Sequence, residues 1–169
     1  METATGTQRE IQIARKPKTA LDYAFRILSM RDYSESTMRE KLYQRFERKE
    51  AEEALEKLKE LNYINDLRYA ENFASSTLLA GYGVYAVIRK LREKGVDANG
   101  GFVKSVAEAR SIDMDALLQS TMKKYLAKTH DEDRISLRTK CFAHMFRRGF
   151  ELRLVEIEFE RLMNESDFS

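Results

Sequence analysis

Basic residues gather in three short segments, and clustered lysine and arginine side chains are the groups in this sequence best suited to bind an anionic partner. Segment 39–49 holds five basic residues and two acids, segment 83–95 holds four and one, and segment 138–148 holds four and none. Such clusters bind phosphates or protein carboxylates. The net charge of the chain is only +2, so binding to nucleic acid must depend on how the charge is distributed. A solvated helix face with ion pairs four residues apart is the alternative for each segment.

Residue types that carry out catalysis are scarce by comparison. Cys141 and His144 lie three residues apart and are the one pair that could serve as nucleophile and base. His130 and His144 are the only histidines, and their spacing does not match a zinc-binding pattern. The sequence lacks the Gly-x-x-x-x-Gly-Lys-Ser/Thr phosphate loop, and Gly81-x-Gly83 lacks the third glycine of a dinucleotide site. We therefore predict a protein that is not an enzyme and holds no cofactor or metal.

The elements that position these residues are predicted to be helices. Charged residues make up 34% of the 169 residues, with one proline and no tryptophan, and this favours an all-α fold. Residues 1–17 are polar and predict a disordered N-terminal arm. No apolar run approaches the ~20 residues of a membrane span, a signal-peptide pattern is missing, and the single cysteine excludes an internal disulfide. We expect a monomeric cytoplasmic protein without contact to a membrane.

One helical pattern occurs three times along the chain. Leu42, Leu91 and Met145 occupy equivalent positions, separated by 49 and 54 residues. Each copy has a long amphipathic helix, a short basic helix and a further helix. Cys141 falls on an apolar position of this pattern, which favours a buried small hydrophobe over a nucleophile. A period near 50 residues with three helices per period predicts tandem three-helix repeats. Their expected boundaries are 18–64, 65–111 and 112–165.

Charge and glycine follow the repeat. The third helices of the outer copies are acidic, with five acids and two lysines in 50–60 and six acids and two arginines in 151–167. Gly95 and Gly149 are predicted to take a left-handed conformation that closes the basic helix before them. Gly81 and Gly83 permit a sharp reversal before the middle basic helix. The charge is therefore banded along the chain in spite of its small net value.

Four motifs carry a resemblance to a known family. LNYINDLRYAENF at 61–73 resembles the LGYLDDxRYAxxF motif of the RecX regulatory proteins, and GYGVYAVIRKLREKG at 81–95 resembles their GYGPxRIRxELRxKG motif. DYSESTMREKL at 32–42 resembles their DYSExELRxKL motif, and RRGF at 147–150 is similar to a motif of their third repeat. The resemblance covers roughly residues 20–163 in the expected order.

The resemblance implies a function as well as a fold. It implies an elongated, curved body of three helical repeats that binds the RecA recombinase filament on single-stranded DNA and inhibits it, in DNA repair, homologous recombination and the SOS response. It leaves open whether the contacts are made mainly to RecA or to DNA. An autonomous DNA-binding protein that uses one basic helix as a recognition helix is the alternative.

Some positions depart from the family motifs. Val84 stands where the family has proline, and Arg45-Phe46 lacks the glycine that usually separates them, so the first basic helix must end differently. Asn99-Gly100-Gly101 places poor helix formers where a helix should begin, which predicts a weakened or delayed helix. These changes bear on how strongly the middle repeat contacts a partner.

The expected partner-binding surface is a stripe of basic side chains. Exposed ion pairs contribute roughly 0–1 kcal/mol each, so we expect binding to depend on the set as a whole. The predicted residues are Arg39, Lys41, Arg45, Arg89, Lys90, Arg92, Lys94, Lys123, Lys124, Arg138, Arg147 and Arg148.

Overall fold

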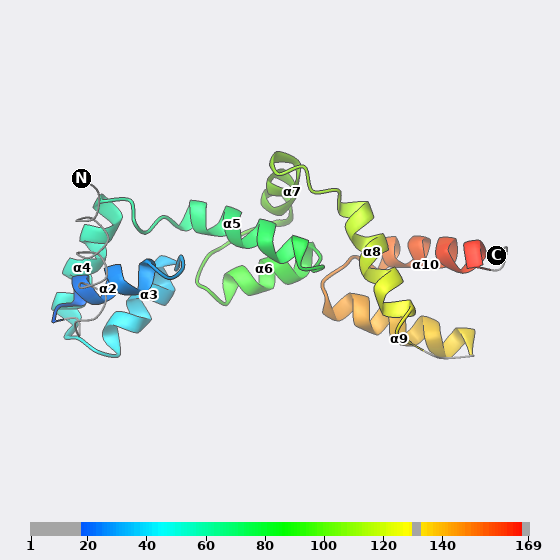
Figure 1. The fold of residues 1–169 in the computed structure, drawn as a ribbon, viewed down its shortest axis with the longest axis horizontal. Helices are drawn as coiled ribbons and strands as arrows, with labels where there is room; N and C mark the ends of the chain where they lie inside the picture. The colour runs from blue at the N-terminus through cyan, green and yellow to red at the C-terminus, as the bar shows by residue number, and fades with distance from the viewer. Residues whose placement is uncertain (1–17, 130–132, 167–169) are drawn as a thin grey trace, which may run out of the picture. The chain divides into compact units, whose positions relative to one another are not determined.

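The computed structural model describes residues 18–129 and 133–166, and within these ranges the chain forms helices and no strands (Figure 1). The helices are α2 (Ala20–Leu28), α3 (Glu35–Tyr43), α4 (Arg48–Glu60), α5 (Asp66–Leu79), α6 (Val84–Arg92), α7 (Gly100–Ala109), α8 (Met114–Leu126), α9 (Arg134–Arg147) and α10 (Leu152–Ser166). The predicted all-α class is confirmed. The arm predicted for residues 1–17 lies outside the described residues.

The chain divides into two compact units, and the boundary falls inside α5 between Tyr69 and Ala70. Unit 1 contains α2, α3, α4 and the first turn of α5. Unit 2 contains the rest of α5 and the helices α6 to α10. The repeat boundaries at 18–64, 65–111 and 112–165, and the curved body, stay predictions.

Unit 1 packs α2, α3 and α4 around one apolar core. Met38 and Leu42 on α3 are fully buried there, together with Leu55 and Leu58 on α4. Alternation at three and four residues places these side chains on one face of each helix, and burial of that face stabilises short helices that would not persist alone.

Polar side chains fix where the helices of unit 1 begin. Thr19 and Ser34 accept the backbone N–H groups of Asp22 and Thr37, so each caps a helix through its hydroxyl oxygen. Asn65 caps α5 in the same way, with its Oδ1 3.0 Å from the N–H of Arg68.

Helix α3 ends without a left-handed residue, as predicted from its missing glycine. The N–H groups of Arg45 and Phe46 both donate to the carbonyl of Leu42, at 3.0 and 2.9 Å, and the described residues of this turn have no positive φ. The aromatic ring of Phe46 packs against the core of unit 1. The first basic helix therefore closes by a tighter turn than the other two.

In unit 2 the basic helices α6 and α9 end on glycine. Gly95 has a φ of 72° and Gly149 a φ of 80°, which confirms the predicted left-handed turns. After α6, Gly95 N–H donates to Arg92 at 2.9 Å and Val96 N–H donates to Leu91 at 3.0 Å. The same pair of bonds closes α9, where Gly149 donates to Phe146 and Phe150 to Met145. This pairing satisfies carbonyls that a helix end would otherwise leave unbonded.

The cores of unit 2 involve the predicted positions. Leu91 on α6 and Met145 on α9 are both fully buried, as is Leu42 in unit 1, so the burial predicted for all three is confirmed. Helix α6 packs on α7, and α8, α9 and α10 pack around a core that includes Met122 and Phe159.

The expectation that Asn99-Gly100-Gly101 would delay a helix is wrong. Helix α7 begins at Gly100 itself. The Asn99 side chain accepts the N–H of Phe102 at 2.9 Å, and this cap offsets the poor propensity of two glycines in the first turn.

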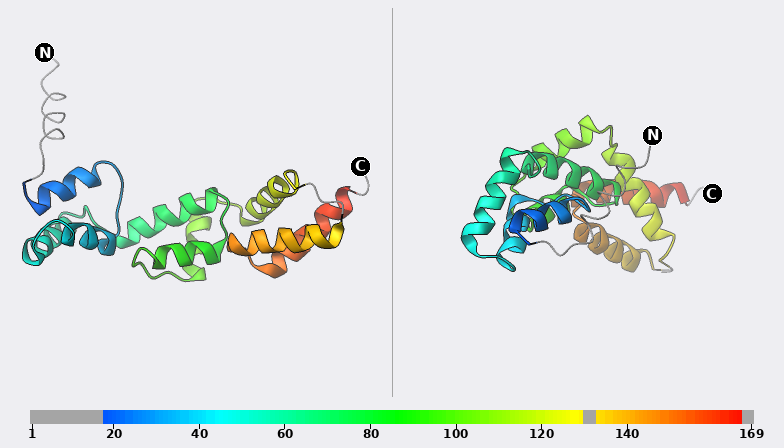
Figure 2. Two further views of the ribbon diagram at one scale, coloured as in Figure 1. Left: turned by 90° about the horizontal axis from the view of Figure 1, so that it is seen from below. Right: turned by 60° about the vertical axis from the view of Figure 1, so that its left-hand side comes forward.

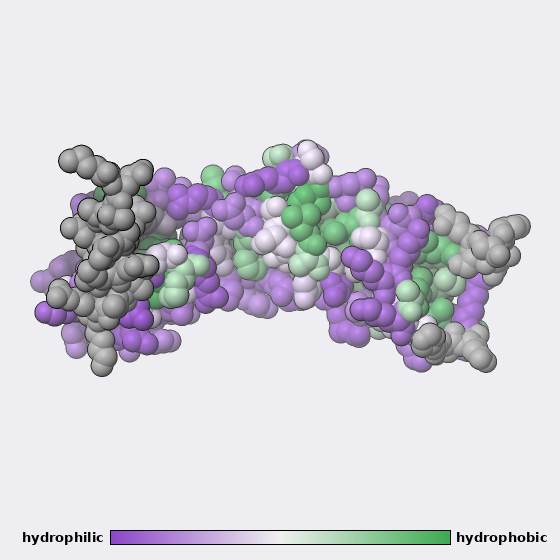
Figure 3. Space-filling model, viewed as in Figure 1, coloured by the Kyte–Doolittle hydropathy of each residue, from purple (hydrophilic) through white to green (hydrophobic). Residues whose placement is uncertain are grey.

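The face of the molecule drawn in Figure 3 is mainly hydrophilic, with apolar areas over parts of unit 2. Leu79 and Tyr85 are the exposed large apolar side chains of α5 and α6 in unit 2, at 67% and 59% exposure.

Candidate partner-binding surface

The start of α6 and the end of α9 are joined through their backbones (Figures 1 and 2). Gly83 N–H donates to the carbonyl of Arg148 at 2.8 Å, and Tyr85 N–H donates to that of Gly149 at 3.1 Å. Gly83 has no side chain with which to cap α6, so carbonyls at the end of α9 take the place of a capping residue. We call this contact the junction.

The junction requires glycine on both sides. A Cβ atom on Gly83 would lie 2.3 Å from the carbonyl oxygen of Gly149, and one on Gly149 would lie 2.1 Å from the backbone nitrogen of Ala86. Both distances are shorter than any real contact, and the obstacles are backbone atoms that cannot rotate away. The start of α6 and the end of α9, more than 60 residues apart in the sequence, are therefore held in close register.

Cationic side chains surround Tyr82 at the junction. Lys90 Nζ lies 4.7 Å and Arg148 Cζ 4.9 Å from the centre of the Tyr82 ring, within the range of cation–π attraction. Arg148 Nη1 also donates to the carbonyls of Ala80 and Gly81, at 3.2 and 2.9 Å. Arg89 Nη2 lies 3.4 Å from the carbonyl of Arg147. We call Arg89, Lys90, Arg147 and Arg148 the junction cations.

No carboxylate among the described residues neutralises the junction cations. Arg89 and Arg148 bond carbonyl oxygens, and Lys90 and Arg148 lie over the ring of Tyr82. For Arg89 and Lys90, the reason lies in the helix packed against α6. Helix α7 contains a single acid, Glu108, whereas α4 and α10 are rich in glutamate. Arg92, on the last turn of α6, is exposed and likewise has no ion pair among these residues. A positive field is left at this surface, and it falls off over about 8–10 Å at physiological salt.

Other predicted binding residues are occupied by interactions within the fold. Arg39 pairs with Glu35 at 2.6 Å and with Glu52 at 3.0 Å, and Lys59 reaches Glu35 at 3.4 Å. Hydrogen bonding to Glu35 is the main reason that the pKa of Arg39 is raised. These charges are balanced where they stand, so Arg39 is not part of a free surface.

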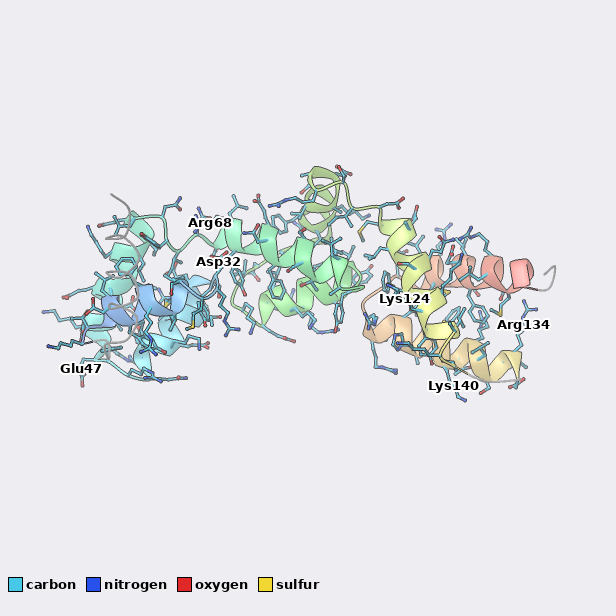
Figure 4. All side chains as sticks on the ribbon, viewed as in Figure 1. Asp32, Glu47, Arg68, Lys124, Arg134 and Lys140 are labelled. Atoms are coloured by element: carbon cyan, nitrogen blue, oxygen red, sulfur yellow. The ribbon has the colours of Figure 1, made fainter. Side chains whose placement is uncertain are left out.

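The remaining predicted binding residues also differ in whether they have a partner within the fold. Arg138 on α9 pairs with Glu156 at 2.5 Å and Glu160 at 3.9 Å, both on α10. In unit 1, Lys41 lies over the ring of Tyr33 and Arg45 over that of Tyr23. Lys94 is half-buried after the end of α6, and Lys123 and Lys124 are exposed on α8; Figure 4 shows Lys124. The structure brings together the four junction cations, and it does not bring together the full set of twelve.

Sequence reasoning missed Tyr82 and misread Gly83. Tyr82 lies between the two glycines of the predicted reversal, and its ring is the shared surface for Lys90 and Arg148. Gly83 has a φ of −85°, so close approach of the Gly149 carbonyl, and not an unusual backbone angle, is what demands glycine there. The Gly81-Tyr82-Gly83 triplet was the sequence signal for a close backbone contact, but the segment that it contacts, at Arg148 and Gly149, is distant in the sequence.

Cys141 and His144 do not form a nucleophile and base. Cys141 is fully buried, and burial raises the pKa of its thiol to about 11, so the thiol is protonated at neutral pH. His144 stacks on Tyr125 with ring centres 4.3 Å apart. Burial lowers the pKa of His144, and the nearby charges of Arg148 and Arg147 lower it further. The expectation of a buried small hydrophobe at position 141 is confirmed.

No helix in residues 18–129 and 133–166 is long and apolar enough to cross a membrane. In the same part of the chain, no three His, Cys, Asp or Glu side chains gather where they could hold a metal ion.

Comparison with known proteins identifies similar chains. Residues 20–58 match the family model of the RecX first three-helix domain, and residues 65–99 match that of the RecX second three-helix domain. A regulatory protein RecX of Haemophilus influenzae (strain PittEE) is 29% identical over 133 residues, which cover 78% of this chain and 86% of that protein. One from Legionella pneumophila (strain Corby) is 28% identical over 145 residues, covering 85% and 94%.

A solved structure supports the fold independently. The crystal structure of RecX from Lactobacillus salivarius superposes with a TM-score of 0.67 at 16% identity, covering 90% of this chain and 97% of that one. The all-α repeat fold expected from the sequence is thereby confirmed.

Proposed function

The chain belongs to the RecX family of regulatory proteins, and from that premise we propose that it binds the RecA filament on single-stranded DNA and inhibits its recombinase and ATPase activity. The observation that carries the proposal is the set of junction cations, which have no carboxylate partner among the described residues. A rigid group of unneutralised cations suits a partner that presents carboxylates or phosphates. We propose that the protein acts as a cytoplasmic monomer and by binding alone, without catalysis.

The alternative of a recognition helix fits the geometry less well. A recognition helix places its N-terminal residues against base edges in the major groove. The N-terminus of α6 instead donates Gly83 and Tyr85 N–H groups to α9, so that end is covered within unit 2. Its cations lie further along the helix, where contacts to a backbone or to acidic side chains are favoured.

The test uses RecA ATPase activity on single-stranded DNA as the readout. We expect the triple variant Arg89→Glu, Arg92→Glu and Arg147→Glu to need about tenfold or more protein for the same inhibition. Arg148 is retained because it holds the carbonyls of Ala80 and Gly81, and its loss would disturb the fold. The salt dependence of inhibition should become flatter in the variant.

A matched control reverses three exposed cations elsewhere. Arg26, Lys49 and Arg153 are exposed and form no ion pair among the described residues, so their reversal to glutamate makes the same change in net charge. This control should inhibit like the parent protein. Equal inhibition by both triple variants and the parent at low salt would overturn the proposal. Binding of each variant to naked single-stranded DNA and to DNA-free RecA then separates the two kinds of contact.

A further inference from the structure

A hollow of about 300 Å³ lies beside the junction, between the end of α5 and the helices α8 and α9. Its charged lining is entirely basic: Lys124 and Lys128 come from α8 and the turn after it, and Arg148 comes from the end of α9. No acid is among the lining residues. Such a volume lies at the small end of the range of ligand sites, and it is large enough for a phosphate group with part of what it is attached to.

One of the three cations of the hollow is held by the fold before any ligand arrives. Lys124 lies on the last turn of α8 and Lys128 in the turn that follows the helix, and both are exposed. Arg148 uses Nη1 on the carbonyls of Ala80 and Gly81, which fixes its guanidinium plane. Its other N–H groups are left for a ligand, and neither lysine has an ion pair among the described residues. A fixed donor with two exposed lysines beside it suits an anion with several acceptor oxygens.

The other walls are aromatic and hydroxyl-bearing. Thr121 is only 8% exposed and lines the hollow, and the stacked rings of Tyr125 and His144 line another part of it. Such rings offer a face on which a planar base can lie. The neighbouring cations act on His144 too, because Arg148 and Arg147 add to burial in lowering its pKa. The imidazole thus responds to positive charge that an anion would cancel.

We propose that this hollow binds a phosphate group, held by Lys124, Lys128 and Arg148, as part of a nucleic-acid strand or of a free nucleotide. A carboxylate offers two oxygens. Glu35 engages Arg39 and Lys59, and Glu160 engages Arg134 and Arg138. Three cations beside an aromatic stack suit the phosphate and base of a nucleotide better. The inference deepens the proposed function, on which its nucleic-acid ligand rests, by assigning one place where a strand is held.

The experiment follows the imidazole by proton NMR in the full chain without RecA. The chain has two histidines, so comparison with His130→Gln assigns the resonances of His144. We expect the titration midpoint of His144 to rise when a short single-stranded oligonucleotide is added, because the bound phosphate offsets the charges of Arg148 and Arg147. ATP and inorganic phosphate are separate arms. A rise with these but not with the oligonucleotide assigns the hollow to free nucleotides, and a rise with the oligonucleotide alone assigns it to a strand.

Variants connect the shift to the lysines. Lys124→Gln with Lys128→Gln should weaken oligonucleotide binding about tenfold and reduce the slope of log affinity against log salt by about 1 to 2. Lys49→Gln with Lys104→Gln removes the same charge from exposed positions outside the hollow and should leave both unchanged. The two double variants therefore separate the location of the charge from its amount.

Three results would overturn the assignment. They are an unmoved His144 midpoint with every phosphate compound, equal effects of the two double variants, and a polyglutamate peptide that moves the midpoint as far as the oligonucleotide does. None of them touches RecA inhibition, which is measured separately. Equal RecA inhibition by both triple variants and the parent, together with an intact His144 shift, would leave this inference standing alone.

Discussion

The basic segment of unit 1 and the basic segments at the junction in unit 2 are similar in sequence, but their side chains have different partners. In unit 1, Arg39 on α3 meets Glu52 on α4 and Glu35 on its own helix, so its charge is cancelled inside the fold. In unit 2, α6 packs on α7, which supplies no carboxylate to it, and Lys90 rests on Tyr82 instead. For α3 and α6, the helix packed against the basic helix therefore decides whether the basic side chains are paired within the fold or left without a carboxylate. A count of charge along one helix cannot make that distinction.

The substitution with the largest expected effect on stability adds a methyl group at the junction. Gly149→Ala forces a φ of 80° on a residue with a Cβ and places that atom 2.1 Å from Ala86 N. The positive φ alone costs about 1–2 kcal/mol, and the clash adds to it. We expect urea denaturation to show a loss of more than about 2 kcal/mol, or a separate early transition of unit 2.

Gly100→Ala is the control for the junction variant. A Cβ there would meet Val84 at an ordinary 3.8 Å, and Gly100 starts α7 with a capping residue before it. Its stability should change by less than about 1 kcal/mol, in the stabilising direction. Similar losses from Gly100→Ala and Gly149→Ala would contradict the close-packed junction.

A second comparison sets Arg148 against Arg39. Arg148→Ala removes charged donors from two carbonyls and should cost about 1–2 kcal/mol. Arg39→Ala opens a surface ion-pair network and should cost about 1 kcal/mol or less. Salt sharpens the contrast in urea titrations. The cost of losing Arg39 should shrink in 1 M salt, while the cost of losing Arg148 should not, because Arg148 is held by carbonyls and has like charges around it.

Cys141 reports on unit 2 alone, because it is the only thiol in the chain. Its burial and a thiol pKa raised to about 11 predict negligible labelling by a thiol reagent at pH 8 until α9 opens. Cys141→Ala should cost about 1 kcal/mol through lost packing and leave RecA inhibition unchanged. Rapid labelling of the native protein would show that α9 opens readily; lost inhibition in a stably folded Cys141→Ala variant would point to a direct role for the thiol.

The smallest expected effect is a pH dependence that separates the two units. The pKa of His144 is lowered in the fold, so the unfolded chain binds the proton more readily, and unit 2 loses stability as pH falls through 6.5. Unit 1 has no histidine. Its Glu52, whose pKa is lowered chiefly by the Tyr43 hydroxyl, contributes stability that is lost only below about pH 4.5. His144→Gln should abolish the first change in urea titrations between pH 7 and 5, and no change in the parent over this window would refute it.

Local features of the fold were predictable from the sequence because their causes are local. The burial of Leu42, Leu91 and Met145 follows from helical spacing, and the left-handed turns at Gly95 and Gly149 follow from the conformation that glycine permits. The error at Asn99 came from weighing glycine propensity without the cap that precedes it.

The candidate site was less predictable because it depends on distant partners. Arg148 reads as a surface cation in an RRGF motif, yet its guanidinium bonds carbonyls 67 and 68 residues away. Arg39 and Arg138 read the same way and are paired with acids of the following helix. The sequence shows that segments 50–60 and 151–167 are acidic. If each is expected to pair with the basic helix before it, both arginines are removed from the predicted stripe.

The junction also limits how the repeats can be exchanged between relatives. The start of α6 depends on the carbonyls of Arg148 and Gly149. In a chimera that takes its last three helices from another protein, carbonyls of the grafted part would have to accept the N–H groups at the start of α6. Such a graft would have to bring a glycine at the position of Gly149 and keep the length of the segment between the two repeats. A shortened chain that stops after α7 would leave the Gly83 and Tyr85 N–H groups to water, and a serine or aspartate at position 83 is the replacement that could repair it. Residues 112 onward are thus not a removable module.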